Sequence, residues 1–161
     1  VSGGRHDPEI FNVIADTGCP YVLTHSRGNS KTMDSFAKYT NVVKDVKHEL
    51  SNQIDLAISK GIKNEQIIID PGLGFAKNVD QNLTLLRNLE EFISMNFQVL
   101  IGASRKRFIG SVINESDPNK RIFGTAAVAS RCVISGVDFL RVHDVQQISQ
   151  VVIMTKSIIN L

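Results

Sequence analysis

The sequence predicts an α/β protein that forms about half of a (β/α)8 barrel, and two observations support this fold class. Amphipathic helical patterns alternate with short apolar runs along the 161 residues, which is typical of a parallel sheet with right-handed crossovers. The pattern gives four strand–helix units behind one leading helix. A complete eight-unit barrel takes about 250 residues. The chain therefore supplies about half of such a barrel.

An open, doubly wound sheet would show the same alternation and is the competing architecture. The polar residues at the strand ends discriminate between the two. All four expected strands are followed at their C-terminal ends by polar clusters. A doubly wound sheet concentrates its ligand groups at one switch point, whereas a barrel collects them from its strands at one rim. The clusters therefore favour the barrel.

The first half of the chain is predicted to contain a helix, a strand and a long helix. Asp7-Pro8-Glu9 combines a capping residue, a proline at the first helical position and an acid in the first turn, so a helix begins there and ends at Gly18. Residues 20–24 form a short strand. An apolar face predicts the next helix, from about Asp34 to Lys60. That face comprises Phe36, Val43, Val46, Leu50, Ile54 and Ile58.

The second half repeats the alternation. Ile67, Ile68 and Ile69 are β-branched and suit a strand buried on both faces. Asn78 or Asp80 then caps a helix. The apolar face of this helix comprises Leu83, Leu86, Leu89 and Ile93. The remaining predicted elements are a strand over Phe97–Ile101, a helix of small residues over Gly124–Ser135, a strand over Val137–Val142 and a helix over Val145–Ile159.

Composition excludes several classes of function. The 18 basic and 16 acidic residues give a formal charge of +2, so there is no sign of a nucleic-acid or membrane-surface footprint. No apolar run reaches the roughly 20 residues of a membrane span, and no signal peptide is recognisable. Cys19 and Cys132 lie far apart and are interpreted as reduced thiols of an intracellular protein.

Asp70 is the first candidate site residue, because it stands where the isoleucine strand leaves the core. Pro71, Gly72 and Gly74 then break regular structure and let the backbone approach a ligand closely. An acid at the C-terminal mouth of a parallel strand is where α/β proteins place chemistry. The alternative is that Asp70 only caps the following turn, a role for which aspartate is well suited.

Arg141 and His143 are the second candidate. They are two residues apart, so on a strand they share one face. A guanidinium beside an imidazole suits a phosphate or pyrophosphate, through charge-assisted hydrogen bonds. The alternative is a surface arginine next to a packed histidine.

The basic run Ser104-Arg105-Lys106-Arg107 follows the third strand. It is too short and too poor in aromatic residues for a nucleic-acid patch. It fits the recognition of an anion or a carbonyl, with some of its charges in structural ion pairs. Asp70 near Lys106 would hold both groups ionised. His25 could be a ligand, but a packed, hydrogen-bonded histidine is the more common situation.

Other chemistries lack their patterns. No His, Cys or Glu grouping has zinc spacing, so no metal ligand is predicted within the chain. No serine lies in a GxSxG turn. There is no P-loop, and Gly72-Leu73-Gly74 lacks the rest of a dinucleotide fingerprint.

Four segments together closely resemble the dihydropteroate synthase family. They are residues 24–33, 70–75, 102–110 and 141–145, and their order and spacing agree over essentially all of residues 1–161. The resemblance implies the C-terminal half, strands five to eight with their helices, of a pterin-binding TIM barrel. It implies the condensation of a dihydropterin pyrophosphate with p-aminobenzoate to dihydropteroate and pyrophosphate, with Mg²⁺ bound to the pyrophosphate and sulfonamide-type compounds as inhibitors.

The resemblance also implies roles for individual residues. Asp70 hydrogen-bonds the pterin ring, and Lys106 contacts the pterin beside the second substrate. Arg141 and His143 hold the pyrophosphate leaving group. The residues implied on the p-aminobenzoate side are Gly74, Phe75 and Arg107. Two positions depart from the family pattern: Arg107 stands where many members have Ser, and Ser26, on the floor of the pterin pocket, stands where many bacterial members have Met.

The resemblance further implies what the chain would need. Val1-Ser2-Gly3-Gly4 looks like the turn after an earlier strand. The family's first four strands would carry the metal-binding residue, so we expect these 161 residues to be part of a larger polypeptide and inactive alone. That polypeptide would be a homodimer through its last helices. In a eukaryote it would be multifunctional, with further folate enzymes, and cytoplasmic or mitochondrial.

Two rival functions remain at this stage. A pterin-dependent methyltransferase barrel would share the aspartate on the pterin, but it would not need Lys106 or the Arg141 and His143 pair. A non-catalytic interaction module would use the small-residue helix and the last helix as a dimer surface. In that case, charge reversal at Lys106 or Arg141 would be harmless.

Overall fold

The computed structural model describes residue 4 and residues 7–159. The chain forms a parallel sheet in the order β1-β2-β3-β4. Its strands are β1 (Tyr21–Thr24), β2 (Ile67–Asp70), β3 (Gln98–Ile101) and β4 (Phe139–Leu140). The strand order follows the chain without a reversal, as in a barrel and unlike a doubly wound sheet. The prediction of a (β/α)8 barrel segment is confirmed. The turn predicted at residues 1–4 lies outside the described residues, apart from Gly4.

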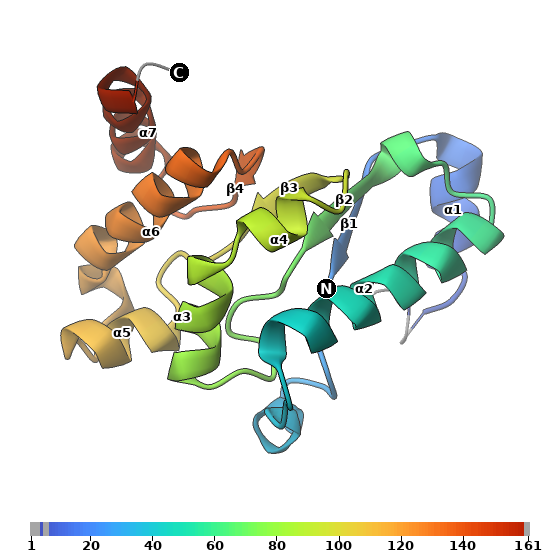
Figure 1. Ribbon diagram of the computed structural model, residues 1–161, viewed down its shortest axis with the longest axis horizontal. Coiled ribbons are helices and arrows are strands. Elements are labelled where there is room, and N and C mark those ends of the chain that lie inside the picture. Colours follow the sequence, from blue (N-terminus) through green and yellow to red (C-terminus); the bar gives the residue numbers. More distant parts are fainter. Residues whose placement is uncertain (1–3, 5–6, 160–161) are drawn as a thin grey trace.

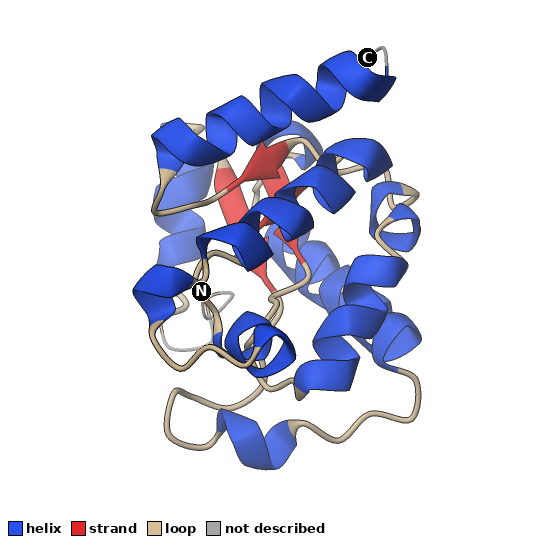
Figure 2. Cartoon of the chain, turned by 90° about the vertical axis from the view of Figure 1, so that its left-hand side faces the viewer, coloured by secondary structure: helices blue, strands red, loops and turns tan. Residues whose placement is uncertain are grey.

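Helices connect the strands and surround the sheet (Figures 1 and 2). The α-helices are α1 (Ile10–Thr17), α2 (Val42–Ser59), α3 (Val79–Arg87), α4 (Glu90–Ile93), α5 (Arg107–Ile113), α6 (Ile122–Ser135) and α7 (Val145–Ile159). Short 3-10 helices are η1 (Met33–Phe36), η2 (Asn64–Gln66) and η3 (Pro118–Lys120). Helix α7 packs against α6 at the far end of the sheet from α1 (Figure 1).

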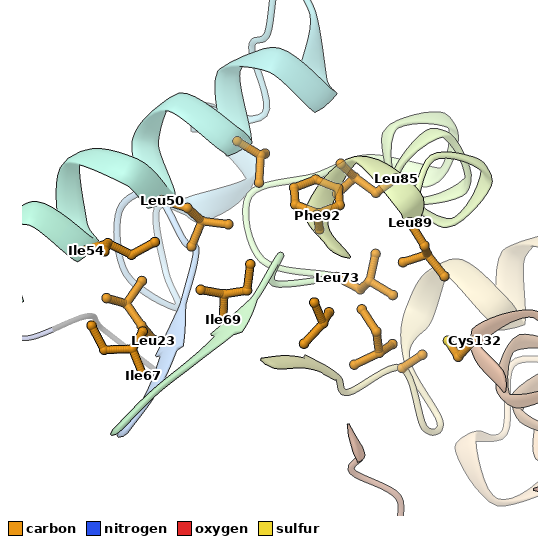
Figure 3. Close-up of a cluster of buried hydrophobic side chains, with 14 of the residues drawn as sticks. Leu23, Leu50, Ile54, Ile67, Ile69, Leu73, Leu85, Leu89, Phe92 and Cys132 are labelled. Carbon is orange, nitrogen blue, oxygen red and sulfur yellow. The ribbon is translucent and has the colours of Figure 1, made fainter. Parts of the chain in front are cut away.

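The hydrophobic core lies between the strands and the helices that follow them (Figure 3). Leu23, Ile67 and Ile69 of the strands meet Leu50 and Ile54 of α2. The core continues through Leu73, Leu85, Leu89, Phe92 and Cys132. The β-branched residues of β2 are all buried, as expected for a strand covered on both faces.

The strand register brings the loops of interest to one edge. Thr24 of β1 pairs with Asp70 of β2, and Ile101 of β3 pairs with Leu140 of β4. Because all four strands run in the same direction, the residues that follow them leave the sheet at the same end. The loops after the strands therefore share one rim.

The long helix predicted from Asp34 to Lys60 is wrong at its start. Residues 33–36 form the 3-10 helix η1, and α2 begins only at Val42. Asn41 has an extended backbone and its side chain accepts a hydrogen bond from Lys44 N at 3.0 Å, which is an N-cap. Phe36 consequently lies outside the apolar face and is exposed.

The helix predicted after residue 78 is in fact two helices. Asn78, not Asp80, is the cap, and its side chain and that of Gln81 exchange hydrogen bonds with each other's backbone N–H in a capping box. The helical geometry ends at Asn88, and α4 begins at Glu90. Leu86 and Leu89 are buried as predicted, but Leu85 and Phe92 are buried in place of Leu83 and Ile93, which are only partly buried.

Three further boundaries differ from the predictions. The last strand, predicted over residues 137–142, pairs only over Phe139–Leu140. Helix α6 begins at Ile122, two residues before the predicted Gly124, and α1 begins at Ile10. Gly18 ends α1 in the left-handed conformation, as predicted.

Candidate active site

Asp70 lies at the end of β2 and is almost fully buried, with 1% of its surface exposed. Its carboxylate accepts hydrogen bonds from Gly72 N at 2.8 Å and from the Thr24 hydroxyl at 3.2 Å. The bond from Gly72 shows that Asp70 does organise the turn. Burial raises the pKa of Asp70, against the opposing effects of these hydrogen bonds and of Lys106 and Arg141. Asp70 is therefore a buried acid with positive charge nearby.

The turn after Asp70 depends on glycine at position 72. Gly72 has φ +70°, and a Cβ atom there would lie 1.8 Å from the carbonyl oxygen of His25. No side chain fits that distance, so the loop rests directly on the backbone that follows β1. The loop is thereby held against the end of the neighbouring strand.

Lys106 reaches across this loop from the end of β3. Its Nζ donates to the carbonyl oxygen of Leu73 and lies 4.4 Å from the centre of the Phe75 ring, a cation–π contact. Burial lowers the pKa of Lys106 to about 8, although Asp70 acts in the opposite direction. The predicted attraction between Asp70 and Lys106 is present. Each favours the charge of the other, but burial outweighs this attraction for both.

Arg141 and His143 lie beside Lys106 in a cleft of about 380 Å³. The Arg141 guanidinium packs over Gly102, where a Cβ atom would lie 3.1 Å from its terminal nitrogen. The Ser104 hydroxyl lies 3.0 Å from His143 Nδ1. Arg141 and His143 line this cleft together and are exposed there, but they follow the last paired residue of β4, so the strand spacing that predicted a shared face does not place them.

A second cleft, of about 570 Å³, lies on the other side of Lys106. Gly74, Lys106 and Arg107 line it, together with Asp34. Arg107 donates to both carboxylate oxygens of Asp34, at 2.9 and 3.2 Å, and both side chains are mostly exposed. Lys106 lines both clefts and therefore joins the cleft at Arg141 and His143 to the cleft at Arg107.

Three other predicted residues differ in their surroundings. Phe75 is partly buried under Lys106 and is absent from the lining of both clefts. Ser26 is buried and also lines neither of them, so its contact with a ligand stays a prediction. Arg105 forms an ion pair with Asp144, at 2.6 and 3.1 Å, which confirms that part of the basic run is structural.

A buried polar network lies behind the site. His25 is fully buried, with Nε2 3.1 Å from Glu49 and Nδ1 2.9 Å from Lys77 Nζ. Arg27 donates to Glu49 and stacks 3.9 Å from the Tyr39 ring centre. The packed interpretation of His25 is thus confirmed. The sequence pattern does not mark Lys77 or Glu49 as site residues. A lysine just before the helix cap Asn78 looks like an ordinary charged residue at the start of a helix.

Two features are absent from the described residues. Within residues 4 and 7–159, no group of three or more His, Cys, Asp or Glu side chains could hold a metal ion. No helix in this part of the chain is long and apolar enough to cross a membrane.

Comparison with known proteins relates this geometry to a family. Residues 1–143 match the family described as "Pterin binding enzyme". The dihydropteroate synthase of Synechocystis is 43% identical over 94% of this chain and 52% of its own length. The folic acid synthesis protein fol1 of Pneumocystis carinii is 39% identical over 98% of this chain and 22% of its own length.

Solved structures agree with the sequence comparison. The dihydropteroate synthase of Thermus thermophilus matches with a TM-score of 0.93 and 36% identity, over 99% of this chain and 63% of that one. The same Thermus protein has been solved with 4-aminobenzoate and with 6HMPPP, and the Yersinia pestis synthase with a sulfonamide drug. The chain spans about half the length of the Synechocystis relative. On this evidence, the chain belongs to the pterin binding enzyme family.

Proposed function

We propose that the natural protein carrying this chain is a dihydropteroate synthase, which condenses a dihydropterin pyrophosphate with p-aminobenzoate. The observation that carries the proposal is the arrangement around Lys106. A buried carboxylate, an exposed arginine–histidine cleft and a second cationic cleft all meet at this one side chain. The names of the relatives support the same reaction.

The pterin side of the reaction is assigned to Asp70. In the reaction, the bond between the pterin methylene carbon and the pyrophosphate oxygen breaks, and the electron pair leaves with pyrophosphate. The pterin carbon then carries positive charge, which a carboxylate on the ring stabilises. Asp70 is already organised by Gly72 and Thr24, so it needs little reorganisation to act.

The leaving-group side is assigned to Arg141 and His143. Pyrophosphate gains negative charge as the bond breaks, and a guanidinium and an imidazole donor stabilise that charge. Mg²⁺ is expected to arrive with the pyrophosphate as part of the substrate. Arg141 and His143 are suited to its phosphate oxygens, whereas this cleft offers no carboxylate among its described lining residues.

The second substrate is assigned to the cleft at Arg107. The amine nitrogen of p-aminobenzoate forms the new bond to the methylene carbon and loses one proton. An aniline nitrogen is already nucleophilic, so no strong general base is required. Gly74 would flank the ring, Arg107 would meet the carboxylate, and sulfonamide-type inhibitors would compete there, whereas contact of Phe75 with the ring stays a prediction.

A second copy of the chain is the proposed partner of the last helices. Helix α7 exposes four large apolar side chains, namely Val145, Ile153, Met154 and Ile158. Exposed apolar side chains gathered on one helix are typical of an interface. Ile153→Glu should convert a dimer of the natural protein into monomers in light scattering. Multifunctional organisation and a cytoplasmic or mitochondrial location stay predictions.

The decisive experiment measures dihydropteroate formation by the full natural polypeptide and by its Lys106→Ala variant. Lys60→Ala is the matched control, because Lys60 is an exposed lysine at the end of α2. We expect the Lys106 variant to lose at least 100-fold in activity while the control keeps it, on the order of the loss of one transition-state donor. No product from the folded natural protein would contradict the proposal. Methyl transfer from a reduced folate would then support the methyltransferase alternative. The absence of both reactions would support an interaction module.

A further inference from the structure

Lys77 is a buried lysine with three hydrogen-bond partners. Only 7% of its surface is exposed. Its Nζ lies 3.0 Å from the carbonyl oxygen of Gly72, 3.0 Å from that of Phe75 and 2.9 Å from Nδ1 of His25. The first two partners bracket the loop that contains Gly74, and the third belongs to the segment after β1. Lys77 therefore connects this loop to the neighbouring strand from inside the protein.

The hydrogen-bond donors and acceptors determine the charges of Lys77, His25 and Glu49. Two of the partners of Lys77 are carbonyl oxygens, which can only accept, and an ammonium group has three N–H donors for its three partners. His25 Nδ1 is then the acceptor, so Nε2 carries the ring proton and donates to Glu49. Every group in the chain Lys77–His25–Glu49 is satisfied only with Lys77 charged, His25 neutral and Glu49 ionised.

The neighbouring charges agree with this assignment. Burial lowers the pKa of His25 to about 4, which leaves the imidazole neutral at neutral pH. Burial would raise the pKa of Glu49, but hydrogen bonds from His25 and Arg27 lower it to about 2. Burial lowers the pKa of Lys77 to about 7. Asp70 and Glu49 favour its charge, whereas Lys106 and Arg27 oppose it.

The loop is thus held by two lysines on different carbonyl groups. Lys106 donates to Leu73 O beside both clefts. Lys77, which is buried and borders the second cleft, donates to Gly72 O and Phe75 O. Asn82 adds one bond, from Gly74 N to its side-chain oxygen at 2.6 Å. The backbone of the loop is irregular, with positive φ at Gly72, Gly74 and Ala76. A segment of this kind keeps its shape only when its surroundings hold it.

We infer that Lys77 is a positioning residue for the p-aminobenzoate side of the site, and that it joins the Gly72–Phe75 loop to His25 only in its ammonium form. This inference rests on the proposed synthase function. A neutral amine has two N–H donors and cannot serve all three partners. If the neutral Lys77 nitrogen accepted a hydrogen bond from His25 Nδ1, the ring proton would lie on Nδ1, and Nε2 could no longer donate to Glu49. Deprotonation of Lys77 therefore breaks one hydrogen bond, either to the loop or at His25.

The first test replaces Lys77 by Met, which keeps the length of the side chain and removes its donors. In the full natural polypeptide we expect the KM for p-aminobenzoate to rise about tenfold, on the order of one lost hydrogen bond to a charged group, with kcat changed less than threefold. In the wild type the same KM should rise as pH increases from 6 to 8, and this rise should be absent in Lys77→Met. Lys60→Met is the matched control. An unchanged KM with the wild-type pH profile would overturn the inference.

A second test separates the loop from the reaction. Amide hydrogen exchange should become about tenfold faster at residues 72–76 in Lys77→Met, while β2 stays protected. Hydrogen exchange needs no turnover, so it tests the loop contact even if the natural protein makes no dihydropteroate. In that case the proposed function is wrong, and the exchange rates alone decide whether Lys77 holds the loop. Unchanged exchange would show that Lys77 does not hold the loop.

A pair of His25 variants covers the case in which Lys77→Met does not fold. The side-chain oxygen of Asn can replace Nδ1 as the acceptor for Lys77, whereas the amide of Gln reaches the position of Nε2 and replaces the donor to Glu49. We expect His25→Asn to keep a KM for p-aminobenzoate near the wild-type value and His25→Gln to raise it. Equal KM values in the two variants would contradict the role of the Lys77 contact.

Discussion

The Ser104 hydroxyl forms two contacts with His143, one to its backbone and one to its ring. It accepts from His143 N at 3.2 Å and lies 3.0 Å from Nδ1. A backbone N–H can only donate, so the single hydroxyl proton is free to point at Nδ1. When the hydroxyl donates to Nδ1 of the neutral imidazole, the ring proton lies on Nε2. Ser104 is itself buried, so the end of β3 orients a histidine that follows β4.

Ser104→Ala should therefore weaken the leaving-group side of the site. We expect kcat to fall about tenfold, as for the loss of one hydrogen bond, with little change in the KM for p-aminobenzoate. Steady-state kinetics of the natural protein measure both quantities. Ser59→Ala is the control, because the Ser59 hydroxyl is exposed at the end of α2, lines neither cleft and bonds only Leu56 O among the described contacts. A rise in that KM without a fall in kcat would place Ser104 elsewhere in the mechanism.

Lys106 should make catalysis sensitive to alkaline pH. Burial lowers its pKa to about 8, so the ammonium loses its proton just above neutral pH. We expect kcat/KM to fall as pH rises from 7 to 9. Lys106→Arg, which stays charged over that range, should reduce this fall even if its overall rate is lower. An identical alkaline limb in the arginine variant would assign the ionisation to another group.

The strand–helix order and the rim of polar residues could be predicted because they depend on short-range patterns. Three isoleucines at 67–69 and the glycine turn after Asp70 leave few alternatives for the backbone. Arg141 and His143 line one cleft, as their position after the last strand indicated, although both lie past the end of β4 and strand spacing does not place them. These predictions needed no knowledge of the distant contacts.

Other features depend on contacts between distant residues, which no local pattern encodes. The late start of α2 is a local exception, because Asp45 accepts bonds from Thr40 N and Asn41 N. Lys77 finds one of its three buried partners in His25, 52 residues away. The net pKa shifts of Asp70 and Lys106 depend on burial, which charge spacing alone does not reveal.

Glu49 should stabilise the fold above acidic pH. Burial opposes its charge, but the bonds from His25 and Arg27 lower its folded pKa from 4.5 to about 2. The stabilisation is therefore fully present above the unfolded pKa and is lost as pH falls toward 2. Glu49→Gln should reduce the free energy of unfolding by about 1–3 kcal/mol at pH 7. Urea unfolding at several pH values should show this difference shrinking below pH 4.5, and a difference independent of pH would contradict the assignment.

Asp70→Asn should separate function from stability. The amide oxygen can still accept from Gly72 N, but the charge that stabilises the pterin is gone, so activity should fall by at least 100-fold. Burial raises the folded pKa of Asp70, so its charge costs stability increasingly as pH rises through that pKa. The variant lacks this cost. Thermal unfolding at pH 8 should therefore show a midpoint no lower than that of the wild type, and a clear drop would mean that the carboxylate is needed for folding.

Asp34 should compete with the substrate carboxylate for Arg107. The two side chains form an exposed ion pair at the cleft where p-aminobenzoate is proposed to bind. Asp34→Asn removes the competing charge, so the KM for p-aminobenzoate should fall several-fold at low ionic strength. Salt screens exposed charges, so the difference should largely disappear at about 1 M NaCl. Asp80→Asn is the control, because Asp80 is exposed outside the lining of this cleft. Because exposed pairs contribute little to stability, the unfolding temperature should not change.

Arg107→Ser should raise the same KM in both the wild type and the Asp34 variant. An equal KM in all of these proteins would mean that the carboxylate of the second substrate binds away from Arg107.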